Sequence, residues 1–272
     1  MTVQFPTVVI TRFAYLGKSG WQVPPEDQAK IIFDRKRLRD RLDLFRDIAV
    51  ASLGQQTDRD FIHYILTSAQ LPEWTRAELD DICRTTLGPD RYVIDARKPA
   101  LARKFVAQFL AERFGDRPVA QVVLDDDDGL AADFVETMKV PAQQHLSQVG
   151  APLPFFLSWP RGYGCVFRDL ARPELYEHSY RFINLGLTLI GRPMDKNILA
   201  IDHLKAPRRF GANVFSDKPM FVRGLHDHND SRVEVTERWT PIANWPEDPV
   251  IRKRFAFLLK FGEAPENAVG RR

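Results

Sequence analysis

The sequence has few cysteines and lacks long apolar runs, and both absences narrow the class of protein. Its two cysteines, Cys83 and Cys165, lie far apart and lack the spacing of a metal site, so we expect two reduced thiols. No stretch approaches the roughly 18 apolar residues of a membrane-spanning helix. Residues 1–13 also lack the basic segment of a signal peptide. These features predict a cytoplasmic protein with no transmembrane segment.

An excess of charge of one sign is also lacking. Lys and Arg number 39 and Asp and Glu 36, which leaves a net charge of +3 in 272 residues. This balance argues against a strongly basic nucleic-acid-binding protein, and we expect no nucleic-acid partner. A non-enzymatic binding module could use the basic helix predicted at residues 34–46, but acidic residues interrupt its basic face. The 19 Phe, 6 Tyr and 5 Trp exclude a disordered chain.

The first half of the sequence alternates predicted strands with predicted helices. Short β-branched and aromatic runs indicate strands, and apolar residues at helical spacing indicate helices. Strands are expected at residues 8–10, 61–66, 92–94 and 119–124, and helices at residues 34–51, 99–114 and 131–146. This alternation predicts an α/β fold whose Rossmann-like, mixed but mostly parallel sheet is flanked by helices. The length fits a single domain of this class.

The second half has a less regular pattern. Two strands are predicted on either side of a turn at residues 161–164, followed by a mostly helical stretch at residues 172–190. The strands expected in this half lie at residues 155–159, 165–167, 219–222 and 232–235. The polar tail at residues 262–272 is expected to be flexible.

Four consecutive aspartates, Asp125 to Asp128, follow the predicted strand at residues 119–124. Adjacent carboxylates repel one another and need a compensating cation when they are partly buried. On an extended chain Asp125 and Asp127 would point to one side, and Asp126 and Asp128 to the other. Such a carboxylate pair at the carboxyl end of a strand suits Mg²⁺ or Mn²⁺. The alternative is a solvated acidic loop. A calcium loop is disfavoured because its alternating Asp/Asn pattern, with Gly and a distal Glu at set positions, is missing.

Three segments together carry a family resemblance: TRF at residues 11–13, SLGQQTDRDFIHYIL at 52–66 and LDDDDGLAADFV at 124–135. The last resembles the Asp-x-Asp segment of glycosyltransferases of the GT-A fold, and the three together resemble bacterial rhamnosyltransferases. The resemblance implies a nucleotide-sugar-binding half at residues 1–130 and an acceptor-binding half at 131–260. It also implies a UDP- or dTDP-sugar donor, a glycan or lipid-linked acceptor, and a Mn²⁺ or Mg²⁺ ion. Peripheral association with a membrane would be compatible with a lipid-linked acceptor.

The same resemblance implies roles for the aspartates. Asp125 would lie near the ribose or the metal, and Asp127 would be the main metal ligand. Asp126 would be a flanking contact to the nucleotide, although a shift of one residue would exchange these roles. A late histidine completes the metal site in related enzymes, and His226 and His228 are both candidates for it. The alternative for these two histidines is a polar turn.

Other residues are candidates for binding the donor. Thr11 and Arg12 end the first strand, and the alternative for Arg12 is a surface position. Asp95 ends the third strand, where it would contact the base or ribose, or cap the following helix. Arg103 would face the diphosphate from that helix, or lie on its solvated face. Arg97 and Lys98, in the preceding loop, are similar.

The acceptor side is less defined. An inverting enzyme needs a carboxylate that deprotonates the acceptor hydroxyl, and Asp202 and Glu177 are the candidates. Trp21, Trp159 and Tyr163 could stack on an acceptor sugar or belong to the core. The sequence thus predicts a metal-dependent glycosyltransferase. The alternative enzyme class is a metal-dependent phosphohydrolase or nuclease that uses the same carboxylates to activate water.

Overall fold

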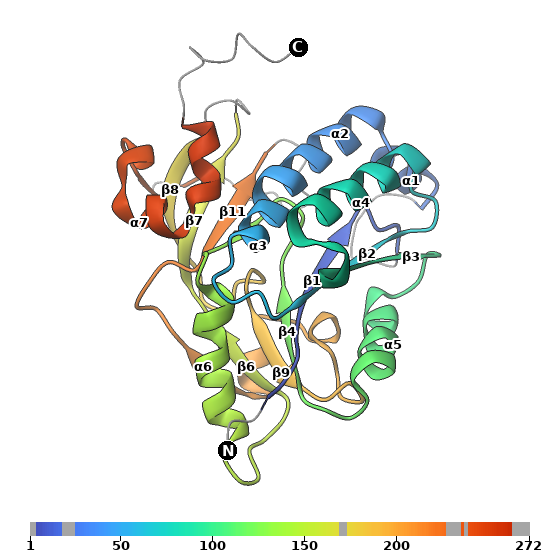
Figure 1. The fold of residues 1–272 in the computed structure, drawn as a ribbon, viewed down its shortest axis with the longest axis vertical. Helices are drawn as coiled ribbons and strands as arrows, with labels where there is room; N and C mark the ends of the chain where they lie inside the picture. Colours follow the sequence, from blue (N-terminus) through green and yellow to red (C-terminus); the bar gives the residue numbers. More distant parts are fainter. Residues whose placement is uncertain (1–3, 18–24, 169–172, 227–234, 237–238, 263–272) are drawn as a thin grey trace.

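The computed structural model of the chain describes residues 4–17, 25–168, 173–226, 235–236 and 239–262. Two β-sheets form its centre, with helices around them (Figure 1). The first sheet has seven strands in the order β10-β6-β9-β4-β1-β2-β3. They are β1 (Thr7–Phe13), β2 (Ile62–Ser68), β3 (Tyr92–Arg97), β4 (Val119–Val123), β6 (Phe155–Ser158), β9 (Thr188–Gly191) and β10 (Gly211–Val214). Only β9 runs antiparallel to its neighbours, β4 and β6. The expected mostly parallel sheet is therefore confirmed.

Helices cover both faces of this sheet because apolar residues alternate along its strands. In β1, Val9 belongs to the core on one face, and Val8 and Ile10 belong to the core on the other. The first core includes residues of α2 (Arg35–Leu44), α4 (Glu73–Leu87) and α6 (Phe134–Leu146), and the second includes residues of α5 (Ala102–Phe114). Together with the mostly parallel sheet, this layering confirms the predicted α/β class.

The second sheet has five strands in the order β12-β8-β7-β11-β5. They are β5 (Gly129–Leu130), β7 (Arg161–Val166), β8 (Glu174–Ser179), β11 (Phe221–Leu225) and β12 (Thr240–Pro241). Helix α7 (Pro249–Arg254) and the short 3₁₀-helix Ala256–Phe261 contribute to the core that includes residues of this sheet. Strand β5 lies between β4 and α6 in the sequence, so the aspartate run connects the two sheets.

Most expected elements of the first half are present with shifted ends. The helix predicted from residue 34 begins at Arg35, where Asp34 accepts a hydrogen bond from the backbone N–H of Arg37 at 2.9 Å. It continues through a π-helical segment, Phe45–Val50, into α3 (Ala51–Gly54). Helices α1 (Pro25–Ile32) and α4 were not predicted. The helix expected from residue 99 begins three residues later, at Ala102.

Two predictions for the second half are wrong. The stretch at residues 172–190 contains β8 and β9 and no helix among its described residues. The expected turn at residues 161–164 lies inside strand β7. Its two glycines do not make a turn but allow neighbouring aromatic side chains to pack closely against the strand. A side chain at Gly162 would collide with Phe221, and one at Gly164 would collide with the ring of Trp239.

Of the two later strands expected in the second half, one is present and one lies mostly outside the described residues. The strand expected at residues 219–222 is β11, which begins two residues later. Residues 232–234 of the last expected strand, and the tail from residue 263, lie outside the described residues. Both cysteines are buried and free.

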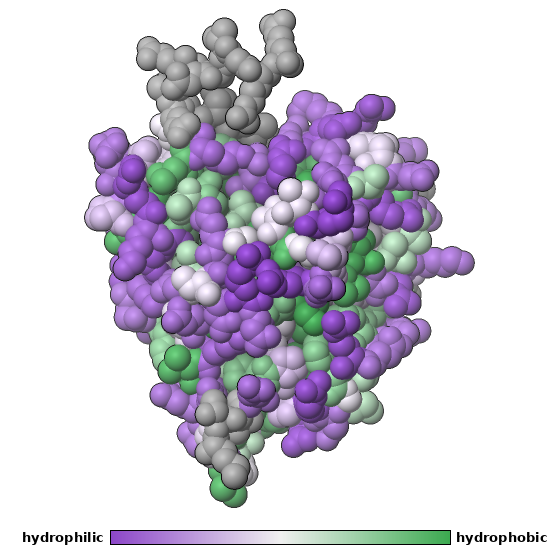
Figure 2. Space-filling model, in the orientation of Figure 1, coloured by the Kyte–Doolittle hydropathy of each residue, from purple (hydrophilic) through white to green (hydrophobic). Residues whose placement is uncertain are grey.

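Within the described ranges, no helix combines the length and the apolar character needed to cross a membrane. The face drawn in Figure 2 is mainly hydrophilic, with apolar patches between the charged side chains.

Candidate functional site

The aspartate run forms a turn at the carboxyl end of β4. Strand β4 ends at Val123, and the backbone N–H of Asp128 donates to the carbonyl of Asp125 at 3.3 Å, which closes the turn. The extended conformation assumed for this run is therefore wrong. The predicted alternation nevertheless appears in the burial of the side chains, since Asp126 and Asp128 are buried and Asp125 and Asp127 are partly exposed.

Asp126 is held by Arg41 of helix α2. The two side chains form a bidentate ion pair, with Nε to Oδ2 at 2.8 Å and Nη2 to Oδ1 at 2.5 Å. The Asp126 side chain is 2% exposed and that of Arg41 is 12% exposed. Burial raises the pKa of Asp126 to about 6, although the charge of Arg41 lowers it. Asp126, expected as a contact to the nucleotide, instead anchors the turn to α2.

Asp127 meets His226, which follows strand β11. Oδ2 of Asp127 lies 2.9 Å from Nε2 of His226, and both side chains are largely buried. Burial raises the pKa of Asp127, but the hydrogen bond from His226 and the charge of Arg41 outweigh it and lower the pKa. The structure thus brings together two of the four residues expected at the metal. His228 lies outside the described residues.

The other two aspartates have separate partners. Oδ1 of Asp128 accepts a hydrogen bond from the backbone N–H of Gly224 at 2.8 Å. Burial, and then the charges of Asp127 and Asp125, raise the pKa of Asp128 well above its usual value. A side chain at Gly224 would collide with the carbonyl of Asp127, so position 224 requires glycine. Asp125 lies outermost, with Oδ1 3.9 Å from Nη2 of Arg12.

The geometry of Asp127 and His226 fits two ligands of one divalent cation. Octahedral Mg²⁺ has bonds of about 2.0–2.1 Å, which place neighbouring ligand atoms about 2.9 Å apart. This spacing matches the 2.9 Å between Oδ2 of Asp127 and Nε2 of His226, which within the chain itself is a hydrogen bond. Among the described residues, no group of three or more His, Cys, Asp or Glu side chains is arranged to hold a metal ion. Asp127 and His226 could therefore hold a divalent ion only together with other ligands, such as water and a bound phosphate.

Thr11 lies beneath the turn, fully buried. Its hydroxyl donates to the carbonyl of Leu124 at 2.7 Å, and Nε2 of His63 lies 2.9 Å from the same hydroxyl. Burial lowers the pKa of His63 to about 3, so the imidazole is neutral. Thr11, expected as a donor contact, supports the end of β4 from inside. Arg12, by contrast, is partly exposed beside Asp125.

Asp95 lies within strand β3, two residues before its end at Arg97, in a polar cluster of its own. It accepts hydrogen bonds from the hydroxyl of Tyr64 at 2.6 Å and from Nε of Arg97 at 2.5 Å. It caps no helix, because α5 begins at Ala102 after Leu101. Arg103 lies exposed on α5, so both alternatives stated for it remain open. Strands β1, β2, β3 and β4 are parallel neighbours, so Arg12, Asp95 and the aspartate turn share one edge of the sheet.

The residues expected to act on or bind the acceptor form no ion pair or hydrogen bond with the aspartate turn in the described part of the chain. Asp202 is exposed and pairs with Lys205 at 3.0 Å. Glu177 lies on β8, opposite Tyr163 of β7 and two residues from Leu175. Trp159 is buried in the core that includes α6, and Trp21 lies outside the described residues. In the described part of the chain, neither Asp202 nor Glu177 forms an ion pair or hydrogen bond with the aspartate turn.

Arg41 is the residue of this site that sequence reasoning missed. It lies on the predicted helix three residues after Leu38 and four before Phe45, both of which are buried. A charged residue beside an apolar stripe needs a buried partner. This position was therefore a signal that a carboxylate packs against α2.

The fold and the site define an α/β protein with a candidate cation and phosphate site at the carboxyl edge of its sheet. The chain matches the family described as "Putative rhamnosyl transferase" over residues 6–238 and belongs to that family. No match was found among the curated proteins.

Similar solved structures include residues 1–349 of S. aureus TarS, with 11% identity and a TM-score of 0.45 over 81% of this chain. A second S. aureus TarS structure has 12% identity and a TM-score of 0.43 over 82% of this chain. The chain covers 60% and 37% of these two chains, respectively. UDP-glucose pyrophosphorylase complexed with UDP-glucose has 8% identity and a TM-score of 0.28 over 70% of this chain and 75% of that chain. These likenesses are weak, and the assignment rests on the family match.

Proposed function

We propose that the protein transfers a sugar from a nucleoside-diphosphate sugar to a hydroxyl group of a glycan or lipid-linked acceptor, with the help of Mn²⁺ or Mg²⁺. The name of the family supports rhamnose as the sugar. The pairing of Asp127 with His226 at the carboxyl end of β4 carries the proposal, because ligands of such sheets bind at that edge.

Asp127 and His226 would hold the cation against the diphosphate of the donor. The metal would supply charge neutralisation of the leaving nucleoside diphosphate. Asp126 and Asp128 would not touch the donor. Through Arg41 and Gly224 they fix the turn between α2 and β11, so that Asp127 faces His226.

Two neighbouring regions would bind the nucleotide. Arg12 lies partly exposed beside Asp125, where its guanidinium can reach a phosphate or ribose. Asp95, near the carboxyl end of β3 on the same edge, would contact the base or ribose, with Arg97 and Tyr64 fixing its carboxylate. Thr11 would support this edge without touching the donor.

A thermal-shift panel tests the proposal. The unmodified protein is heated with UDP, dTDP, GDP, CDP or ADP, each with Mn²⁺ and with EDTA. A ligand that binds only the folded protein raises its melting temperature by mass action. We expect one diphosphate to stabilise the protein in the presence of Mn²⁺ and to lose this effect in EDTA. If none of the five diphosphates stabilised the protein, the proposal would be contradicted.

Product analysis distinguishes this function from hydrolysis. The donor selected by the panel is incubated with the protein, with and without a glycan acceptor. A transferase should form sugar–acceptor product and release nucleoside diphosphate as the acceptor is supplied. Release of phosphate from simple phosphate esters would instead indicate a phosphohydrolase.

A further inference from the structure

A cavity of about 520 Å³ lies at the end of the second sheet where β7 begins and β8 ends. Its main side chains are Arg161, Glu177, His178, Tyr180, Trp239 and Asp248. None of these belongs to the aspartate turn. A cavity of this size, with several polar groups directed at one space, is typical of a site for a small ligand.

Aromatic rings form part of the wall. The ring of Trp239 lies 4.3 Å from that of His178 and packs on the backbone at Gly164, where any side chain would collide with it. Tyr180 is 49% exposed and lines the same space. Tyr163 packs against Phe255 at 5.2 Å and also lines the cavity. Such rings offer flat apolar surfaces beside polar groups.

The charges in the cavity disfavour a phosphate ligand. Glu177 and Asp248 contribute two carboxylates, and Arg161 contributes one guanidinium, which also donates to the carbonyls of Ser216 and Asp217 at 3.3 Å. Burial, and then the charge of Arg223, lower the pKa of His178 to about 4, so its ring is neutral. The cavity therefore suits a neutral ligand with many hydroxyl groups.

A pyranose ring has this chemistry, because C–H groups cover its faces and hydroxyls surround its rim. The faces can stack on an aromatic ring, and the hydroxyls can donate to carboxylates and accept from a guanidinium. Glu177 is well suited to accept such a bond: its backbone pairs with β7 and β12, but its carboxylate makes no ion pair or hydrogen bond with any other described residue.

The cavity is connected to the candidate donor site by strand β11. Pro219, just before this strand, lines the cavity, and Gly224 near its other end contacts Asp127. Five residues of strand at about 3.3 Å each separate the two places by roughly 16 Å. A single sugar that fills the cavity cannot also reach a donor held at Asp127, whereas a longer glycan could occupy both places.

We propose that this cavity binds a sugar unit of the acceptor glycan at a distance from the point of transfer. The proposal rests on the proposed function, since it assumes that the acceptor is a carbohydrate. It assigns Glu177 to acceptor binding, with Tyr180 and Trp239 as stacking surfaces. The acceptor would then be an oligosaccharide or polysaccharide, and its longer forms would bind more tightly.

Binding to an array of bacterial glycans tests the inference on the full-length protein. The variants are Tyr180→Ala and Glu177→Gln, and Glu112→Gln is the matched control because Glu112 is an exposed carboxylate on α5. Because Tyr180 and Glu177 are exposed, both variants should fold, which circular dichroism checks. We expect the wild type and the control to bind the same glycans, and the two cavity variants to bind them at least tenfold more weakly.

Two results would overturn the inference: no glycan bound by the wild type, or glycan binding that survives both cavity substitutions. The thermal-shift panel with nucleoside diphosphates and Mn²⁺ is run on the same preparations. Nucleotide binding without glycan binding would reject the inference and leave the proposed function intact. Glycan binding without binding of any nucleotide would reject the proposed function instead.

Discussion

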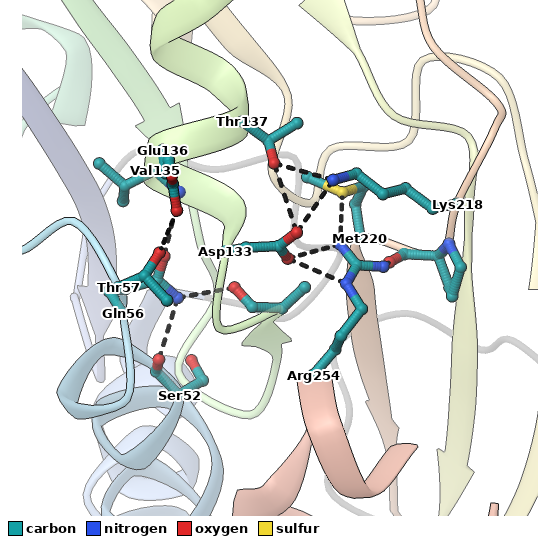
Figure 3. A network of polar contacts seen from close by, with 12 residues as sticks. Ser52, Gln56, Thr57, Asp133, Val135, Glu136, Thr137, Lys218, Met220 and Arg254 are labelled. Carbon is teal, nitrogen blue, oxygen red and sulfur yellow. Dashed lines mark hydrogen bonds and ion pairs between the residues drawn. The ribbon is translucent and has the colours of Figure 1, made fainter. Parts of the chain in front are cut away.

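Asp127 and Asp133 lie six positions apart in the sequence, on either side of the short strand β5. Asp133, just before α6, accepts hydrogen bonds from Nε and Nη2 of Arg254 at 2.9 and 2.6 Å, and from Nζ of Lys218 at 2.9 Å (Figure 3). Burial raises the pKa of Asp133, but these two cations outweigh it and lower the pKa. One carboxylate therefore has two cationic partners within the chain.

In the aspartate turn, four carboxylates are crowded together, and the pKa values of Asp126 and Asp128 are raised. Clusters of perturbed groups are found at functional sites more often than in purely structural networks. The comparison shows how two aspartate sites that are close in sequence can differ. Asp133 joins α6, α7 and the segment before β11, whereas Asp127 contacts His226 within the cluster of aspartates.

Asp127→Asn should give the largest effect. The amide keeps the size of the side chain and loses the negative charge that attracts a divalent cation. We expect sugar transfer to fall by at least roughly a hundredfold, with little change in the melting temperature. Chromatographic measurement of product formation checks the rate, and Glu112→Gln serves as the control. A variant with wild-type turnover would show that Asp127 is not a ligand.

Arg41→Met should give the largest loss of stability. Removing one partner of a buried ion pair leaves the other charge uncompensated, which costs about 3 kcal/mol. The pair of Arg41 and Asp126 joins the turn to α2, and its side chains are only 12% and 2% exposed. Urea denaturation measures the free energy of unfolding. A change below the scatter of replicate measurements would mean that the turn does not depend on this pair.

Asp133→Asn should cost less stability and leave catalysis unaffected. The lost hydrogen bonds to Arg254 and Lys218 are charge-assisted, and their loss should lower the free energy of unfolding by about 2 kcal/mol. We expect the transfer rate per folded molecule to match the wild type. If this variant lost transfer as strongly as Asp127→Asn, the division between a structural and a functional aspartate would fail.

The stability difference between the wild type and Asp133→Asn should also depend on pH, which is a smaller effect. The native pKa of Asp133 is lowered, so its contribution is present above the usual pKa of about 3.9 and is lost as the pH falls through the native value. The stability difference between wild type and Asp133→Asn should be constant from pH 7 to about pH 5 and shrink in more acidic solution. Denaturation curves at pH 7, 5 and 3.5 provide the measurement. A difference that grows in acid would refute this sign.

Strands β1, β2 and β4 were predictable because their apolar runs are buried on both faces and have few competing interpretations, and β3 because its short run at residues 92–94 is β-branched and aromatic. Residues 161–164 were misread because glycine marks turns in most sequences. Here Gly162 and Gly164 make room for Phe221 and Trp239, which lie far along the chain. Helix α4 had a usable signal in the spacing of its buried residues Leu79, Ile82 and Leu87.

For the site, the aspartate run and a late histidine were visible in the sequence, but their pairing was not. His226 is 99 positions from Asp127, and Arg41 is 85 positions from Asp126. Only the packing of β11 and α2 against the turn selects these partners. Burial likewise distinguishes Thr11, inside the sheet, from its neighbour Arg12 at the surface.

Calorimetric titration tests the central claim most directly. The nucleoside diphosphate selected by the thermal-shift panel is titrated into wild type, Asp127→Asn and Asp133→Asn, each with Mn²⁺ and with EDTA. We predict Mn²⁺-dependent binding of equal affinity to the wild type and Asp133→Asn, and loss of that binding in Asp127→Asn. Equal Mn²⁺-dependent affinity in Asp127→Asn and the wild type would contradict the assignment of Asp127 to the metal.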